Sequence, residues 1–278
     1  MKILVTGANG YLGRGVVKEL CSGGHLVIAA DFSTDHVCAG AMKYECDLFG
    51  VENPYDFFGQ PDVLLHMAWR DGFIHNSPAH IQDFEKHYRF LEQMMRSGVN
   101  RVAIMGSKHE IGFFEGSVDE HTPCNPMSLY GISKDALRKS VQLLSAQTGA
   151  AYQWLRAYYI VSNQRNSGSI FSKLAAAEQN GQSEFPFTTG QNQYDFLDYE
   201  DFCTRVAAAV VQDEVSGIIN ICSGQPEKLA DRVERFIKEN GYSIKLRYGA
   251  FPDRPYDSKA IWGNDTKIRQ ILRNSPMR

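Results

Sequence analysis

Residues 2–13 read KILVTGANGYLG, a short apolar run followed by three glycines at G-x-x-G-x-x-G spacing. Glycines in this arrangement let the backbone turn tightly between a strand and a helix and approach a pyrophosphate at the helix N-terminus. Asp31 ends a second apolar run about 20 residues later, where a dinucleotide fingerprint places its acidic residue. The pattern predicts a dinucleotide-binding βαβ unit, with a purely structural glycine turn as the alternative.

Asp31 favours NAD over NADP. A carboxylate at this position can accept hydrogen bonds from both hydroxyls of the adenosine ribose, whereas it would repel a 2′-phosphate. Residues 32–36, FSTDH, contain no Arg or Lys that would compensate. We therefore expect NAD as the cofactor, and the alternative for Asp31 is a carboxylate that caps the loop after the strand.

Short apolar stretches alternate with amphipathic helical stretches along most of the chain. This alternation predicts an α/β fold, a doubly wound parallel sheet of the Rossmann type with a smaller C-terminal substrate lobe. The composition changes at the polar loop near 163–168 and again after Gly224. We expect the following division of the chain: a Rossmann domain at 1–162, a lobe segment at 163–193, a return to the Rossmann domain at 194–223 and the C-terminal lobe at 224–278.

The bulk composition is typical of a folded protein that binds small molecules. The 278 residues are 43% hydrophobic and 22% charged, with a net charge of -3 and no cluster of basic residues for nucleic acid. The apolar runs are far shorter than the ~20 residues that cross a membrane. The opening residues lack the features of a signal peptide, so we expect a cytoplasmic protein.

The six cysteines indicate no metal site. They contain no C-x-x-C pair and do not cluster with histidines. Reduced, mostly buried thiols are the expected state in a cytoplasmic protein. We therefore predict that the protein binds no metal.

Tyr130 and Lys134 are the first candidates for catalysis. Residues four apart on a helix share one face, so the phenol and the ammonium are expected to lie close together. A nearby ammonium should lower the pKa of the phenol, which could then exchange a proton with a substrate hydroxyl or ketone during hydride transfer. Ser107 follows the apolar run at 101–105 and is expected to hydrogen-bond the same substrate oxygen.

With these residues in view, the sequence resembles the extended short-chain dehydrogenase/reductase family, which contains nucleotide-sugar epimerases, dehydratases and ketoreductases. The resemblance covers nearly the whole chain. Its landmarks appear in the family's order: the glycine turn, His66-Met67-Ala68, Gly106-Ser107, residues 126–134, Leu155-Arg156, Asp195-Phe196-Leu197-Asp198 and residues 219–224.

The resemblance implies a role for each site residue. Tyr130 would be the general acid/base, Lys134 would tune it and hold the nicotinamide ribose, and Ser107 would position the substrate oxygen. The residues expected at the cofactor are Gly7, Asn9, Gly10, Tyr11, Leu12, Gly13, Asp31, Asp47, Leu48, Met67, Ala68, Trp69, Tyr130 and Lys134. Those expected at the substrate are Ser107, Lys108, His109, Tyr159, Tyr194 and Arg254. For Lys134 and Arg254, a solvated charge is the alternative.

Two positions after Ser107 depart from the dehydratases. Lys108 and His109 stand where those enzymes have the Asp-Glu pair that removes water, so we expect no 4,6-dehydration. A cysteine occupies the His109 position in the double epimerase-reductases, but residues 164–172 offer no histidine partner. His109 is therefore interpreted as an ordinary loop histidine, with a proton-transfer group as the alternative.

Other departures concern the substrate. Tyr159 stands where the family has asparagine, Tyr194 where it has arginine, and Asp83 where it usually has asparagine. The two tyrosines replace groups directed at phosphate or sugar with aromatic surface. The substrate is therefore expected to be unusual for the family.

Three hypotheses remain open at this point. The leading one is an NAD(H)-dependent epimerase or ketoreductase that acts at a hexose carbon, C4 being expected, of a nucleotide-linked sugar. The second is a dehydrogenase or reductase of a non-nucleotide alcohol or ketone, and the third is a non-catalytic cofactor-sensing protein. The resemblance also implies that helices near 81–97 and 130–146 can form a homodimer contact.

Overall fold

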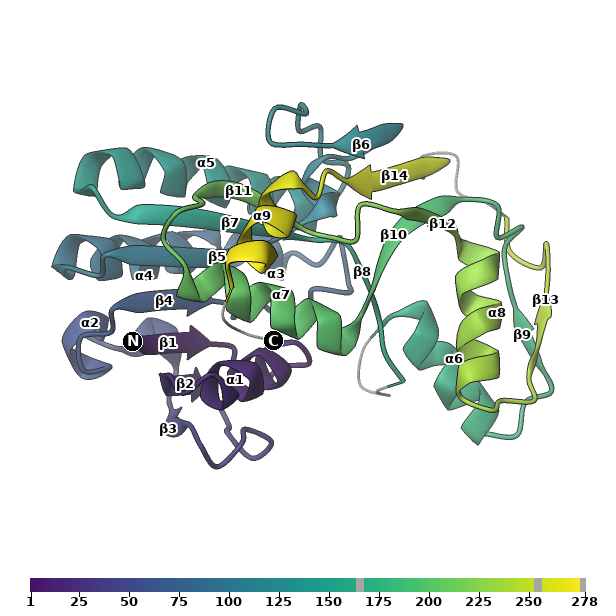
Figure 1. Cartoon of the computed structure of the whole chain (residues 1–278), viewed down its shortest axis with the longest axis horizontal. Coiled ribbons are helices and arrows are strands. Elements are labelled where there is room, and N and C mark those ends of the chain that lie inside the picture. The colour runs from purple at the N-terminus through teal and green to yellow at the C-terminus, as the bar shows by residue number, and fades with distance from the viewer. Residues whose placement is uncertain (164–167, 253–256, 276–278) are drawn as a thin grey trace.

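Seven parallel strands form the central sheet (Figure 1). The computed structural model describes residues 1–163, 168–252 and 257–275. The strands lie in the order β11 (Gly217–Ile221), β7 (Ala151–Ala157), β5 (Arg101–Ser107), β4 (Val63–His66), β1 (Lys2–Thr6), β2 (Leu26–Asp31) and β3 (Met42–Glu45). A parallel sheet covered on both faces needs nearly continuous apolar strands, which explains the short apolar runs in the sequence.

Helices cover both faces of this sheet. Successive residues of β1 alternate between two cores: Ile3 and Val5 belong to one apolar cluster and Leu4 to the other. One face is covered by α1 (Gly13–Ser22), α7 (Tyr199–Val211) and α9 (Thr266–Asn274), the other by α2 (Pro54–Phe57), α4 (Phe84–Ser97) and α5 (Leu129–Thr148). The doubly wound α/β prediction is confirmed.

The order of the strands reverses at β1, which pairs with β2 on one side and β4 on the other. Open parallel sheets bind ligands at the carboxyl ends of the strands, where such a reversal leaves a crevice. The glycine turn after β1, residues 67–69 after β4 and the end of β5 all lie at this edge. The topology therefore brings the predicted cofactor and catalytic segments together.

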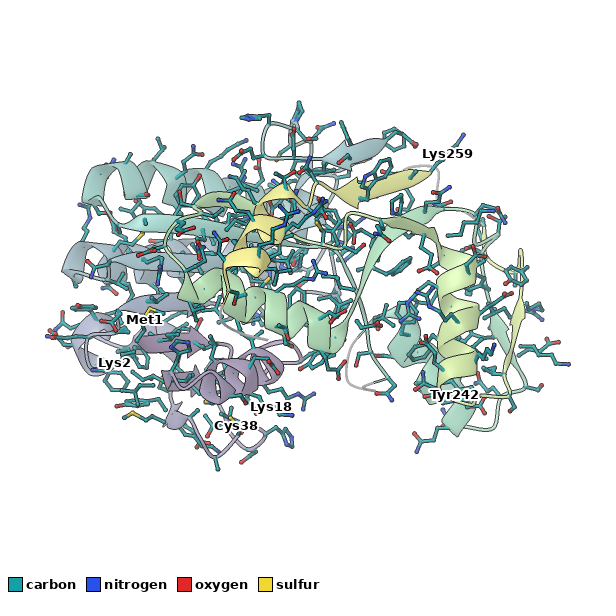
Figure 2. All side chains as sticks on the ribbon, in the orientation of Figure 1. Met1, Lys2, Lys18, Cys38, Tyr242 and Lys259 are labelled. Carbon is teal, nitrogen blue, oxygen red and sulfur yellow. The ribbon has the colours of Figure 1, made fainter. Side chains whose placement is uncertain are left out.

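A second sheet carries two of the predicted substrate residues, Tyr159 and Tyr194. It contains β12 (Pro226–Lys228), β10 (Gln193–Asp198), β14 (Ala260–Gly263) and β6 (Gly116–Val118), with β8 (Tyr159–Val161) paired to β10. The lobe beyond it is formed by α6 (Ile170–Gln179), α8 (Leu229–Glu239) and the pair β9 (Glu184–Pro186) with β13 (Lys245–Arg247) (Figure 1). Tyr242 lies in this lobe, at the opposite end of the molecule from Met1 and Lys2 (Figure 2).

Two details refine the sequence expectations. The single helix expected at 81–97 is divided at Asp83 into α3 (Ala79–Gln82) and α4, and the Asp83 carboxylate pairs there with Arg70 and Lys86. The last helix, α9, packs on α7 and β11, so the end of the 224–278 segment returns to the central sheet. The division into lobes otherwise stays a prediction.

Two kinds of feature are absent from the described part of the chain. No helix there is long and apolar enough to cross a membrane. Within the same residues, no group of three or more His, Cys, Asp and Glu side chains is arranged to hold a metal ion.

Candidate active site

The glycine turn requires its glycines. Gly7 has a φ of +68°, and a Cβ there would lie 2.6 Å from the backbone nitrogen of Ala68. A Cβ on Gly13 would lie 2.1 Å from the carbonyl oxygen of Gly7. The Gly10 N–H donates to the same carbonyl at 3.1 Å, which closes the turn. These contacts allow α1 to start directly behind β1 and leave the turn beside residues 67–69.

The Asp31 carboxylate holds this turn to the end of β2. Its oxygens accept hydrogen bonds from the backbone N–H of Asn9 at 2.9 Å and of Phe32 at 2.8 Å. The Asn9 side-chain oxygen accepts from the backbone N–H of His36 at 2.9 Å. Asp31 therefore caps local backbone, as the alternative interpretation expected, at the same edge where an adenosine ribose would bind.

The remaining cofactor candidates also lie along this edge. Asp47 accepts from the Phe49 N–H at 3.2 Å and begins the short helix η1 (Leu48–Gly50), in which Leu48 is buried. Tyr11 is tied to α7 because its carbonyl accepts from the Tyr199 hydroxyl at 2.7 Å, and Leu12 is the N-cap of α1. Among the described residues no side chain caps α1 at Leu12, so the turn keeps the open helix N-terminus that suits a phosphate.

The two segments that follow β1 and β4 are joined by Thr6. Its carbonyl accepts from the Met67 N–H at 3.1 Å, and its hydroxyl accepts from the Ala68 N–H at 3.4 Å. The loop that carries Trp69 is therefore held directly beside the glycine turn.

Ser107, Tyr130 and Lys134 meet at the carboxyl end of β5. Ser107 is the last residue of β5, and the other two lie on the first turns of α5, which Ser128 caps by accepting from the Gly131 N–H at 3.2 Å. A hydrogen bond joins the side chains of Ser107 and Tyr130. The Lys134 ammonium donates to the Met105 carbonyl at 2.8 Å and lies 6.0 Å from the centroid of the Tyr130 ring.

The expected lowering of the Tyr130 pKa is wrong for this structure. Burial raises the pKa of Tyr130 to about 12, the Ser107 hydrogen bond lowers it partly, and the charge of Glu110 raises it further. Burial also lowers the pKa of Lys134 to about 7, against the opposing effect of Glu110. The ammonium is directed at Met105 rather than at the phenol, so desolvation dominates and Tyr130 is protonated at neutral pH.

Glu110 is a site residue that sequence reasoning missed. It is fully buried, and its carboxylate accepts from the Ser107 N–H at 2.6 Å and from the Trp154 indole N–H at 2.9 Å. Arg156 pairs with it at 3.4 Å. The Ser-x-x-Glu spacing of a capping box was the available signal, and this box starts η2 (Lys108–Glu110) and fixes Ser107.

Aromatic rings surround Tyr130, and only two of them were predicted. His75 stacks on the Tyr130 ring at 5.7 Å, and His109 approaches both, 4.1 Å from His75 and 5.8 Å from Tyr130. Trp69 and His80 complete the group at 6.1 and 5.2 Å from Tyr130. His75 and His80 lie in and after a loop that carries no motif, so their approach to Tyr130 could not be predicted from the sequence.

Three of the predicted substrate residues, Lys108, Tyr159 and Tyr194, lie against one another and are called the aromatic wall below. Tyr159 and Tyr194 stack at 4.4 Å between centroids, and the Lys108 ammonium lies 4.9 Å from the first ring and 5.9 Å from the second. Lys108 and His109 also line a cavity of about 80 Å³. Arg254 lies outside the described residues. A larger cavity of about 610 Å³ lies between α1, α7 and α9, at the opposite edge of the sheet from the catalytic side chains.

Comparison with known proteins places this site in a family. Residues 3–222 match the NAD dependent epimerase/dehydratase family, and the chain belongs to it. A dTDP-6-deoxy-L-talose 4-dehydrogenase (NAD(+)) from Aggregatibacter actinomycetemcomitans is 42% identical over 269 residues, which cover 95% of this chain and 99% of the relative. A UDP-glucose 4-epimerase from Lactobacillus helveticus is 23% identical over 98% of this chain and 91% of its own.

Solved structures share the fold. The UDP-N-acetylglucosamine 4-epimerase of Methanobrevibacter ruminantium M1 has a TM-score of 0.85 at 17% identity, over 97% of this chain and 91% of its own. The UDP-glucuronic acid 4-epimerase of Bacillus cereus, in complex with UDP-glucuronic acid and NAD, has a TM-score of 0.82 at 20% identity, over 99% and 94%. The chain is an NAD-dependent enzyme of the short-chain dehydrogenase/reductase type, and the family and NAD predictions are confirmed.

Proposed function

We propose that this enzyme oxidises and reduces C4 of a nucleotide-linked 6-deoxyhexose with NAD(H), as a 4-dehydrogenase or ketoreductase rather than an epimerase. The observation that carries this proposal is the meeting of Tyr130, Ser107 and Lys134 at the carboxyl edge of the sheet that also carries the glycine turn. The much greater identity to the dTDP-6-deoxy-L-talose 4-dehydrogenase than to the UDP-glucose 4-epimerase favours net oxidation or reduction.

The protonation state of Tyr130 supports ketone reduction. Reducing a C4 ketone requires a hydride at carbon and a proton at oxygen. NADH supplies the hydride when bound. With its pKa raised to about 12, Tyr130 carries the phenol proton at neutral pH and donates it to the oxygen that becomes the C4 hydroxyl. Ser107 donates a hydrogen bond to that oxygen, and oxidation runs the same steps in reverse.

Lys108 supports an anionic substrate. Tyr194 stands where the family has an arginine, so that positive charge is absent from the wall. The Lys108 ammonium lies over both tyrosine rings and supplies a positive charge there instead. Cations over aromatic faces are stabilised by the ring quadrupole, which orients the ammonium while leaving it able to attract phosphate. We propose that Lys108 faces the diphosphate and that the stacked tyrosines contact the sugar or the base.

We also propose that the enzyme does not dehydrate its sugar substrate and that it forms a homodimer. Lys108 and His109 provide no carboxylate pair, so we expect no loss of water from the sugar. A homodimer through the outer face of α4 and α5 would cover Ile132 and Leu143, which are 44% and 67% exposed. Light scattering of the purified chain distinguishes a dimer from a monomer.

The proposal is tested by supplying substrates directly. We expect the enzyme to form NADH when given NAD⁺ and dTDP-6-deoxy-L-talose, and to consume NADH when given the corresponding 4-ketone. Interconversion of UDP-glucose and UDP-galactose without net NADH would instead establish an epimerase. Turnover of simple alcohols or uronates but of no nucleotide sugar would establish the second candidate, which the aromatic wall of Tyr159 and Tyr194 favours.

A further inference from the structure

The ring of Trp69 lies directly against the Lys134 ammonium. The Lys134 nitrogen is 3.6 Å from the centroid of the Trp69 ring, whereas it is 6.0 Å from the centroid of the Tyr130 ring. Lys134 is 3% exposed, and its ammonium donates a hydrogen bond to the Met105 carbonyl. An ammonium removed from water gains much more from an aromatic face than an exposed one does.

A hydrogen bond to His80 fixes the plane of the Trp69 ring. The indole N–H donates to Nδ1 of His80 at 3.1 Å. Because an indole nitrogen only donates, Nδ1 must accept, and the remaining proton of neutral His80 lies on Nε2. That nitrogen lies 3.0 Å from the Ile74 carbonyl and donates to it. His80 is 2% exposed, so this orientation is held inside the protein.

The other side of Trp69 rests on His87. The two rings stack at 4.4 Å with an angle of 15° between their planes. His87 in turn contacts Nε2 of His66 through Nδ1 at 2.9 Å, and Nδ1 of His66 contacts the Thr6 hydroxyl at 2.8 Å. Hydrogen bonds and stacking thus connect Thr6, the residue before Gly7, with Trp69 and Lys134.

Few charges act on Lys134 in this cluster. Burial lowers the pKa of His87 to about 3 and that of His66 well below its ordinary value, so both rings are neutral near pH 7. Tyr130 is also neutral, since its pKa is raised to about 12. Glu110 is the negative group that favours the ammonium. Of Lys134, His66, His87 and Tyr130, Lys134 is therefore the group whose charge changes between mildly acidic and mildly basic pH.

We propose that Trp69 is a positioning residue whose ring, oriented by His80 and His87, holds the Lys134 ammonium beside the Met105 carbonyl and stabilises its charged form. Trp69 then acts on the reaction through Lys134, without contact with the reacting atoms. This role concerns cofactor binding and does not depend on which sugar the enzyme uses.

The test compares Trp69→Leu, which removes the ring, with Trp69→Phe, which keeps an aromatic face but loses the bond to His80. NADH affinity is measured by calorimetry across a pH series, with Trp262→Phe in β14 as the matched control. Protonated Lys134 is expected to hold the nicotinamide ribose, so affinity should fall as the pH rises through the Lys134 pKa. In Trp69→Leu this fall should begin about one pH unit lower, and in Trp69→Phe the change should be smaller.

A spectroscopic readout assigns the transition to Lys134. The fluorescence difference between the unmutated protein and Trp69→Phe should change with pH at the midpoint measured for NADH affinity. This pH dependence should disappear in Lys134→Met. The Lys134→Met variant is necessary because His75, His80 and His109 also lie near Tyr130 or Trp69. An unchanged midpoint in folded Trp69→Leu would overturn the proposal. If that variant does not fold, an unchanged midpoint in Trp69→Phe together with a Trp69 signal that persists in Lys134→Met would do so.

Discussion

The predicted cofactor edge, formed by the glycine turn and Asp31, and the predicted substrate wall, formed by Lys108, Tyr159 and Tyr194, are built in different ways. At the cofactor edge, backbone geometry determines the site: Gly7 needs a positive φ, Gly13 has no room for a side chain, and Asp31 binds the backbone of Asn9. The substrate wall consists of side chains from separate elements, with Lys108 from η2, Tyr159 from β8 and Tyr194 from β10. A backbone-determined site tolerates few substitutions, whereas side chains on a stable sheet can change and alter the substrate.

Tyr130→Phe should have the largest effect, because it removes the phenol that is proposed to transfer the proton to the substrate oxygen. The variant keeps the ring but loses the proton-transfer oxygen, so turnover should fall by ~10²–10⁴-fold. NADH affinity should stay nearly unchanged. Single-turnover rates and calorimetry measure the two quantities, and near-normal turnover would show that another residue carries the proton.

Lys134→Ala provides the contrast to that variant. Its ammonium is expected to hold the nicotinamide ribose, so NADH affinity should fall, and turnover should fall with it because the cofactor is held less well beside Tyr130. Ser107→Ala should mainly lower turnover. A Lys134→Ala variant that keeps full NADH affinity would show that the ammonium does not hold the cofactor.

Asp31→Ala tests the cofactor edge. The carboxylate is expected to bind the ribose hydroxyls, and in this structure it also holds Asn9. Hydrogen bonds to a charged group are worth ~1.5–3 kcal/mol, so NADH affinity should fall ten-fold or more. Asp35→Ala, an exposed carboxylate on the same loop, is the matched control. Tighter binding of NADPH than NADH by the unmutated protein would contradict this account.

Acid should weaken the fold through the histidines beneath the cofactor edge. The folded-state pKa of His87 is lowered from 6.5 to about 3, so its contribution is complete above about pH 6.5 and is lost as the pH falls towards 3. Each pH unit in that window should cost about 1.4 kcal/mol of unfolding free energy. Urea unfolding should show a smaller pH dependence in His87→Gln than in the unmutated protein. His121→Gln, an exposed control, should change nothing, and an equal slope in His87→Gln would refute the assignment.

Lys108→Ala should have the smallest effect and separates the two regions most cleanly. Loss of one partly exposed cation should weaken binding of a nucleotide sugar several-fold, about 1 kcal/mol, with NADH affinity unchanged. Lys18→Ala on α1 is the matched control (Figure 2). An equal effect of both variants would mean that Lys108 contributes only to overall charge.

Sequence reasoning succeeded where short-range chemistry determines structure. The glycine turn, Asp31 and the Tyr130–Lys134 spacing were predicted because each lies within one local motif, and the structure brings them to one edge. The direction of the Tyr130 pKa was predicted wrongly, because helical spacing does not reveal that Lys134 points to Met105 and Trp69. His75 and His80 were missed because their approach to Tyr130 depends on how a loop folds over the end of α5.

The most direct test of the proposed chemistry follows the hydrogen at C4. A nucleotide-linked 6-deoxyhexose carrying deuterium at C4 is incubated with NAD⁺, and the released cofactor and the sugar are examined by mass spectrometry. The proposed dehydrogenase should place the deuterium in reduced cofactor that leaves the enzyme, with a 4-ketone as the product. Deuterium that stays at C4 of an inverted sugar, without net reduced cofactor, would contradict the account and establish an epimerase.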